Sequence, residues 1–341
     1  MRFKKFTEPV VFVVLFFILN YLVANVFTNT IMSFSQYNRQ DKEFFSSHDD
    51  LHYLIMGDSH SEAGLNPEII GSSYNYSSPA ENYIHTYYKL KYILNNSSRK
   101  IDTVILPIDL HSLSSYKTDR VIIMNQHYLD SYYWLKYIDC IEVGFYKGKL
   151  LHYMVDYFIA RFFNYAGKMN NVFEYFFNEQ KVVPLIKGFT TFEGDYNHAK
   201  EKDPTRAKRQ AAFHLKNCDY FDRDLVFYFK NTIELCHRNG IKVILVKYPV
   251  TRDYYVHASR FIPIERLSQK VDALITKYPG IPILDYHSVF FNHNELFLNS
   301  DHLNYQGGCK LSRIIKKRLA EMDRDKTAFP GSLINSSSEE D

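Results

Sequence analysis

Short apolar runs alternate with amphipathic segments over most of the chain, and this alternation constrains the fold more than any other feature. The predicted strands cover residues 51–56, 101–108, 241–246 and 281–284. The predicted helices cover residues 79–94, 223–238, 264–278 and 304–322. Strands that are separated by helices usually pair in parallel, with helices covering both faces of the sheet. We therefore expect a three-layer α/β/α fold with a central parallel sheet.

The alternation is interrupted in the middle of the chain and stops near its end. Residues from about 116 to 216 are rich in aromatic side chains at helix-like spacing, and we interpret them as a helical insertion that acts as a lid or docking surface. Residues 323–341 are rich in Ser and Glu and are expected to be disordered. The α/β domain is therefore expected at residues 51–322.

An uncharged segment precedes this domain. Residues 9–38 contain no charged side chain, and the most apolar part, residues 10–27, has about the length needed to cross a bilayer as a helix. Arg2, Lys4 and Lys5 on its N-terminal flank favour a cytoplasmic start. A cleaved signal or a buried core helix are the alternatives, but no small-x-small cleavage site follows. We expect a membrane anchor at residues 1–32, a linker at residues 33–50 and an extracytoplasmic domain.

Composition excludes some classes of function. The 341 residues are 46% hydrophobic and carry a formal net charge of +3, which is typical of a globular protein and argues against nucleic acid as the main partner. The cysteines lack the spacing of a zinc site, and no metal or cofactor is predicted. An extracytoplasmic location permits disulfides, although buried free thiols are favoured; the cysteines are Cys140, Cys218, Cys236 and Cys309.

A Gly57-Asp58-Ser59 triplet directly follows the first predicted strand. A serine nucleophile needs a nearby base and hydrogen-bond donors for the oxyanion. At the end of a strand the Ser59 hydroxyl would be exposed, and its backbone N–H could serve as one such donor. Asp and Ser are also common in turns and helix caps, so the triplet alone fits a purely structural turn as well.

A second polar motif, Asn299-Ser300-Asp301-His302, precedes the last predicted helix. A histidine at a loop–helix junction beside a carboxylate suits a general base. In a parallel sheet the carboxyl ends of the strands gather at one edge, where reactive groups collect. The alternation thus predicts that Ser59 and His302 lie at the same edge.

Together, residues 56–61 (Met-Gly-Asp-Ser-His-Ser) and residues 301–307 (Asp-His-Leu-Asn-Tyr-Gln-Gly) resemble the first and last motif blocks of the SGNH/GDSL hydrolase superfamily. The resemblance covers residues 51–322 apart from the insertion. It is closest to the membrane-anchored members that act in teichoic-acid D-alanylation and alginate O-acetylation. It implies a flavodoxin-like fold in which Ser59 takes up an acyl group and His302 removes its proton.

The chain departs from this family pattern in its third acid. Family members usually place the acid three residues before the histidine, where this chain has Asn299. Asp301 is the nearest carboxylate, but adjacent side chains tend to diverge. Asp285, at the end of a predicted strand, is a further candidate.

The oxyanion donors also depart from the pattern. The resemblance places the backbone N–H of Ser77 or Ser78 in the oxyanion hole beside that of Ser59. The block that normally carries an asparagine donor reads Leu-Pro-Ile-Asp-Leu-His at residues 106–111 and contains no Asn. One donor therefore stays unassigned.

Further side chains are candidates for substrate contacts. His60 and His111 follow predicted strands and could line the site, although ordinary loop histidines are the more common reading. Arg252, with Lys247, could meet an anionic substrate. His287 is expected to be structural.

Three functions follow from these features. The first is transfer of an acyl group, most simply acetyl, to an envelope or exported polysaccharide, beside a multispanning membrane acyltransferase that delivers the group. The second is an esterase that removes such groups, since only the acceptor differs. The third is an inert binding or scaffold protein with the same fold, which the departures at Asn299 and at residues 106–111 favour.

Overall fold

The computed structural model describes residues 4–32, 36–117, 139, 141–143, 148, 150–163, 165–166, 173, 176–177, 184–194, 205–278 and 280–328. Much of the expected insertion therefore lies outside the described residues, as do Cys140 and residues 329–341. The remaining cysteines, which the structure describes, are free thiols.

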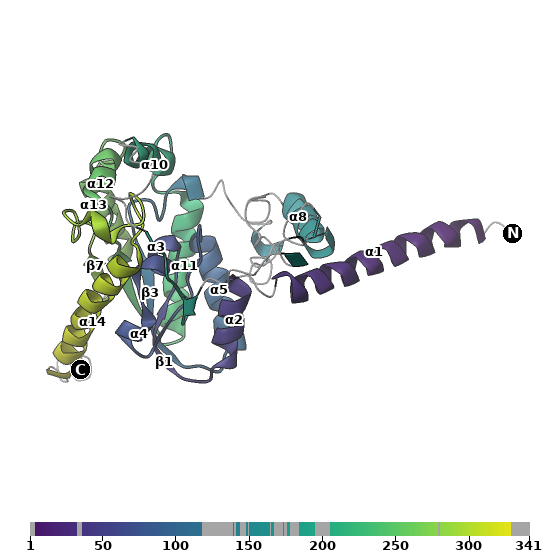
Figure 1. Ribbon diagram of the computed structural model, residues 1–341, viewed down its shortest axis with the longest axis horizontal. Coiled ribbons are helices and arrows are strands. Elements are labelled where there is room, and N and C mark those ends of the chain that lie inside the picture. The colour runs from purple at the N-terminus through teal and green to yellow at the C-terminus, as the bar shows by residue number, and fades with distance from the viewer. Residues whose placement is uncertain are drawn as a thin grey trace, which may run out of the picture.

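A five-stranded parallel sheet lies at the centre of the α/β domain, with the strand order β2-β1-β3-β6-β7 (Figure 1). Its strands are β1 (Leu51–Ile55), β2 (Ser73–Asn75), β3 (Ile101–Pro107), β6 (Lys242–Lys247) and β7 (Ile283–Asp285). The predicted α/β fold with a central parallel sheet is confirmed. The predicted strands lie within one or two residues of those observed.

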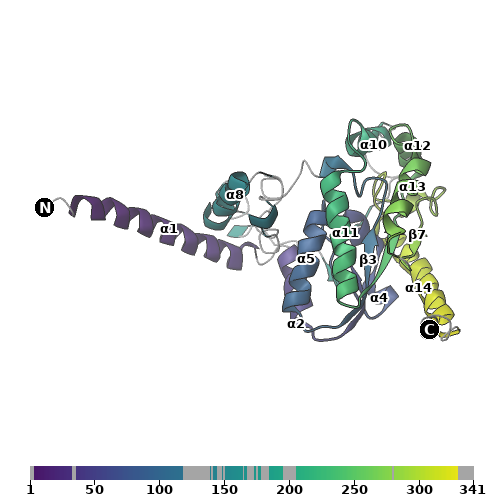
Figure 2. The same cartoon turned by 180° about the vertical axis from the view of Figure 1, so that it is seen from behind.

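Helices cover both faces of this sheet. They are α3 (Ser59–Gly64), α4 (Pro67–Ile70), α5 (Tyr83–Asn96), α11 (Arg223–Arg238), α13 (Ile264–Ile275) and α14 (Tyr305–Ala328). Helices α10 (Arg206–Leu215) and α12 (Arg252–Ala258) pack against each other at one end of the domain (Figure 1). On one face α5 and α11 lie side by side (Figure 2). On the other face α14 packs against α3 and α4.

The alternation of side chains along β3 explains why both faces are covered. Val104 and Leu106 belong to the core beneath α5 and α11, whereas Ile105 between them belongs to the core beneath α14. All three side chains are fully buried. A strand that is apolar on both sides can only lie in the middle of such a sandwich.

Outside the expected insertion, the structure differs from the sequence-based expectations in three elements. The segment expected to be a linker contains the helix α2 (Gln36–Ser46), because Phe44 packs between Tyr74 and Tyr76 with ring centroids 5.0 and 4.7 Å away. Helix α14 continues to Ala328, through the first residues of the expected tail. The short strand β2 was not predicted, because its sequence, Ser-Tyr-Asn, has no apolar run.

The described parts of the expected insertion are mixed in structure. Helix α8 (Leu150–Phe163) and helix α10 agree with the expected helical character. A short antiparallel pair, β4 (Leu185–Ile186) and β5 (Phe189–Thr190), does not. The 3₁₀ turns η2 (Ser115–Lys117) and η3 (Asn294–Leu296) complete the described elements.

Helix α1 (Lys4–Thr30) extends away from the α/β domain in both views (Figures 1 and 2). Its segment Glu8–Thr30 has a mean hydropathy of 2.5 and is 17% buried, so it is long and apolar enough to cross a membrane. The low burial argues against a core helix. The extracytoplasmic placement of the domain stays a prediction.

Candidate active site

Ser59 lies at the first position of helix α3, directly after the turn that ends β1. Asp58 caps this helix, because its side-chain oxygen accepts a hydrogen bond from the backbone N–H of His60 at 3.0 Å. Gly57 makes the turn with a φ of +134°, which side chains rarely allow. The turn presents the Ser59 hydroxyl at the carboxyl edge of the sheet.

Gly57 should not tolerate a side chain. A Cβ atom there would lie 2.6 Å from the Pro107 ring and 2.7 Å from the Ser61 hydroxyl. Gly57→Ala should lower the free energy of unfolding by more than the roughly 1–3 kcal/mol of backbone strain alone. Gly71→Ala is the matched control, because its φ is +84° but its Cβ would meet no atom within 4 Å. Equal losses in denaturant titrations of the two variants would contradict this account.

The structure brings Ser59 and His302 into direct contact across the site. The Ser59 Oγ atom lies 2.7 Å from the His302 Nε2 atom. The short antiparallel bridge between Phe297 and Leu303 holds the His302 loop at the start of α14. The His302 side chain is 19% exposed, so the pair lies at the surface rather than in the core.

Two side chains face the other ring nitrogen of His302. Its Nδ1 atom lies 3.1 Å from the Asn299 Oδ1 atom and 3.3 Å from the Asp301 Oδ1 atom. The Asn299 oxygen also accepts the backbone N–H groups of Asp301 and His302, at 3.1 and 2.9 Å. These backbone bonds bend the loop so that the adjacent side chains of Asp301 and His302 meet instead of diverging. Asn299, at the position where the family carries its third acid, thus shapes the loop. The negative charge near His302 comes from Asp301 instead.

Asp285 was the other candidate for the third acid, and the structure does not support it. Its carboxylate is half-exposed and lies 2.9 Å from the Lys247 Nζ atom. It also lies 3.7 Å from the Nδ1 atom of His287, not near His302. Burial would raise the pKa of Asp285, but the hydrogen bond from Lys247 and the charges of Lys247 and His287 together lower it.

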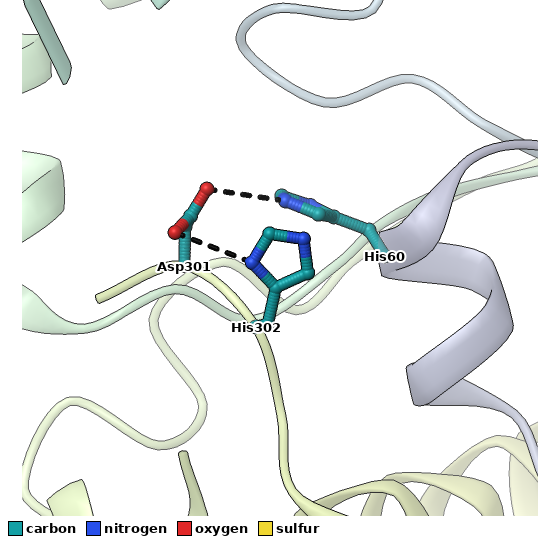
Figure 3. Close-up of side chains that lie close together, drawn as sticks. All are labelled: His60, Asp301 and His302. Carbon is teal, nitrogen blue, oxygen red and sulfur yellow. Dashed lines mark ion pairs between the residues drawn. The ribbon is translucent and has the colours of Figure 1, made fainter. Parts of the chain in front are cut away.

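His60 is buried beside His302, with ring centroids 4.8 Å apart, and faces the same Asp301 carboxylate (Figure 3). The His60 Nε2 atom is 3.6 Å from the second carboxylate oxygen of Asp301, and its Nδ1 atom is 3.1 Å from Asp109. Burial alone would lower the pKa of His60, but the hydrogen bond to Asp109 and the nearby Asp301 carboxylate raise it to about 10. His60 is therefore a buried cation at neutral pH.

The charge on Asp301 is stabilised in turn. Its side chain is fully buried, and burial alone would raise its pKa. The nearby His302 and His60 rings hold that pKa well below its usual range instead. Asp301 is thus ionised at neutral pH and positioned to stabilise a positive charge on His302.

The stabilising contribution of His60 should depend on pH. Because the pKa of His60 rises from its usual 6.5 to about 10 in the folded state, its contribution is complete below pH 6.5 and is lost as the pH rises towards 10. His60→Gln should therefore lower the thermal midpoint most at pH 6, and the gap from wild type should narrow at pH 10. A difference in thermal midpoint that widens with pH would contradict the raised pKa of His60. His293→Gln, which changes an exposed histidine, is the control.

His111, which was predicted to contact the substrate, does not reach the surface of the site. His111 is buried, with its Nε2 atom 3.6 Å from Asp58, and burial lowers its pKa to about 4, so it is neutral at neutral pH. It stacks on His214 with ring centroids 4.6 Å apart. Asp58 also forms a buried ion pair with Lys117. His60 and His111 are therefore buried behind the Ser59–His302 pair and do not line the surface of the site.

Arg252 lies on the exposed surface at the start of α12. Its guanidinium donates a hydrogen bond to the Asn292 side chain at 3.2 Å and lies 5.7 Å from the Phe291 ring centroid. None of these contacts links it to Ser59 or His302. His287 is buried, 3.6 Å from Asp109, as expected for a structural residue.

The predicted oxyanion donors Ser77 and Ser78 are already engaged. The Ser78 N–H donates to the Gly57 carbonyl at 3.0 Å, and the Ser77 N–H donates to the Asn75 side chain at 3.2 Å. The N–H of Ser59 has no acceptor within its own helix, because it occupies the first helical position. Of the three predicted donors, Ser59 alone is thus placed to bind an oxyanion.

Asn75 has a role that the sequence did not reveal. It is fully buried, and its amide donates to the Ser61 and Leu65 carbonyls at 2.8 and 2.9 Å. It thereby holds the short α3 helix against the end of β2. No sequence feature indicated this role, because the strand β2 that Asn75 ends was not predicted.

Two groups of side chains have the spacing of metal ligands among the described residues. One combines His60, Asp301 and His302, and the other combines Asp58, His60 and Asp109, with the ligand atoms of each group within 4.8 Å of one another. The donor atoms already face partners within both groups, as in the contact between His60 and Asp109. Both groups share His60, which could bind a cation only after losing the additional proton that it carries.

Comparisons with known proteins do not assign the chain to a family. No family model and no curated protein matches it. Among solved structures, it is similar to a chain from Streptococcus pneumoniae provisionally described as a platelet activating factor. The TM-score is 0.38 at 12% identity, over 87% of this chain and 96% of that one. A similarity of this size assigns no activity.

Proposed function

We propose that this protein is a serine-dependent acyl-ester enzyme that transfers an acyl group, most simply acetyl, to a hydroxyl of an envelope or exported polysaccharide. The observation that carries the proposal is the 2.7 Å contact between the Ser59 Oγ and His302 Nε2 atoms. A serine next to a histidine base, with an ionised carboxylate behind that base, is the arrangement that activates a hydroxyl for acyl transfer.

The reaction would proceed in two steps. Ser59 attacks the carbonyl carbon of the acyl donor while its proton passes to the Nε2 atom of His302. The oxyanion accepts a hydrogen bond from the Ser59 N–H, and collapse of the intermediate expels the leaving group, which takes the proton from His302. The acceptor hydroxyl then loses its proton to His302 and attacks the acyl-serine. Collapse of this second intermediate breaks the bond between the Ser59 Oγ atom and the acyl carbon, and His302 returns the proton to Ser59.

Asp301 and His60 would assist both steps without touching the substrate. The ionised Asp301 stabilises the positive charge that develops on His302 and fixes the Nδ1–H tautomer. The cation on His60 keeps Asp301 ionised and in place, since burying an unpaired carboxylate is costly. His60 is therefore a positioning residue that acts through Asp301.

The apolar helix α1 favours a reaction at the membrane surface. An anchor of this kind would keep the α/β domain beside the bilayer, where a multispanning acyltransferase could deliver the acyl group from the other side. The acceptor would then be a polymer at the cell surface or in export.

An esterase is the second candidate, because its chemistry differs only in using water as the acceptor. The 19% exposure of the His302 side chain, which opens the base to solvent, favours this candidate. Mass spectrometry of the polymer separates the two: Ser59→Ala in the producing cell should remove acyl groups if the protein transfers them. A gain of acyl groups would indicate hydrolysis, and an unchanged polymer would contradict both.

An inert binding protein is the third candidate, favoured by the engaged N–H groups of Ser77 and Ser78. A fluorophosphonate probe tests it, because such a reagent forms a stable bond only with an activated serine. Failure of the purified wild-type protein to react would favour the inert protein.

A further inference from the structure

Helix α8 packs directly against the apolar helix α1. The ring of Phe17 contacts Phe158 and Phe162, with centroids 5.4 and 5.8 Å apart. Phe16 contacts Phe163 with centroids 6.3 Å apart. A segment more than a hundred residues downstream thus joins the apolar helix through an aromatic interface.

Polar contacts within the same interface suit a site away from water. The Arg161 guanidinium donates a hydrogen bond to the Tyr21 hydroxyl at 3.2 Å and lies 5.2 Å from the Tyr21 ring centroid. The Tyr165 hydroxyl donates to the Asn20 side chain. Hydrogen bonds and a cation–π contact are the means by which polar side chains are accommodated in an apolar layer.

The position of this interface along α1 fixes its depth. The apolar span covers Glu8–Thr30, and the residues that contact α8 lie in its middle, between Phe16 and Tyr21. At about 1.5 Å per residue, they are roughly 14–21 Å from the Thr30 end of the helix. The hydrocarbon core of a bilayer is about 30 Å thick. If α1 crosses the bilayer, the C-terminal half of α8 must lie near its midplane.

The exposed side chains of α8 that the structure describes are apolar as well. Its exposed apolar side chains include Leu151, Met154, Val155 and Tyr157, at 76%, 49%, 46% and 43% exposure. An unpaired apolar surface of this kind is unfavourable in water. The helix has 14 residues, which is too short to cross a bilayer but suits a segment that enters it and returns.

We propose that α8 is a re-entrant membrane segment, with its exposed apolar side chains in contact with lipid acyl chains. This proposal goes beyond the proposed activity and depends only on α1 crossing the bilayer. The α/β domain would then be held to the membrane at two points, which limits its rotation about α1. Such a restraint would fix the height and direction of the Ser59 site above the bilayer.

Spin labels in the full-length protein, reconstituted in phosphatidylcholine–phosphatidylglycerol vesicles, test the proposal. A genetically encoded spin-labelled residue would replace Tyr157 on α8, which leaves the buried cysteines in place. Leu19 on α1 and Val256 on α12, both exposed, provide the membrane and aqueous references. The readout is relaxation by oxygen, which concentrates in lipid, against relaxation by a water-soluble nickel chelate.

The label at position 157 should resemble the label at position 19, with oxygen accessibility several-fold above nickel accessibility, and position 256 should show the reverse. An aqueous signature at 157 beside a lipid signature at 19 would place α8 outside the bilayer and overturn the proposal. Protection from both reagents would show that protein rather than lipid covers α8, and would also overturn the proposal. An aqueous signature at position 19 would show that α1 does not cross the bilayer, which would also overturn the proposal. A label at Met154 repeats the test if the Tyr157 variant does not fold.

Discussion

Ser59→Ala should lower acyl transfer by about 10⁴-fold or more, because no other group can take up the acyl chain at this position. The fold should survive, since the Ser59 side chain is not part of either buried core. The measurement is the rate of acyl release from a chromogenic ester by the purified protein in detergent. This loss is the largest that the proposed mechanism predicts.

Ser61→Ala is the matched control for this variant. Ser61 lies two positions further along the same short helix, and its hydroxyl is buried away from the Ser59–His302 pair. The control should keep most of its activity. If both variants lost activity equally, the cause would be the stability of α3, not the nucleophile.

Asp301→Asn should lower the rate by about 10²–10⁴-fold, because the charge on His302 would lose its stabilising carboxylate. Asn299→Ala removes a neutral partner of the His302 Nδ1 atom and weakens the loop that places Asp301, so its loss should approach that of Asp301→Asn without exceeding it. The same ester assay compares the two variants, with thermal unfolding as the check on folding. A larger loss in Asn299→Ala than in Asp301→Asn would contradict the assignment of the third acid.

The double variant Asn299→Asp, Asp301→Asn sharpens this comparison. It returns the carboxylate to the position three residues before the histidine, where the resemblance places it. Partial recovery of the rate relative to Asp301→Asn alone would show that His302 needs a charge from either position. No recovery would show that the buried position, next to His60, is essential.

The central strands and the long amphipathic helices could be predicted from the sequence. Strands β1, β3 and β6 each contain a run of apolar residues, and α11 was predicted at the bounds observed, because its sequence is amphipathic and an Asn-Gly pair ends it. The short strand β2 and helix α2 could not, because both depend on packing. Phe44, for example, shows its buried role only when Tyr74 and Tyr76 surround it.

The sequence predicted which residues form the catalytic pair, but it did not predict which side chains contact that pair. The resemblance placed Ser59 and His302 together, although 243 residues separate them. Which carboxylate faces His302 depends on the loop that the Asn299 side chain bends, and that bend has no sequence signal. The protonation of His60 likewise requires two carboxylates, Asp109 and Asp301, that come from different strands and loops.

The most direct test of the Ser59–His302 pair is the second-order rate of fluorophosphonate labelling, measured on intact protein by mass spectrometry. The wild type should be labelled on the Ser59-containing peptide. His302→Ala should react at least about 10³-fold more slowly, because a serine without its base is a poor nucleophile. His293→Ala, which removes an exposed histidine, should react like the wild type. Equal labelling of wild type and His302→Ala, or labelling at a residue other than Ser59, would contradict the account.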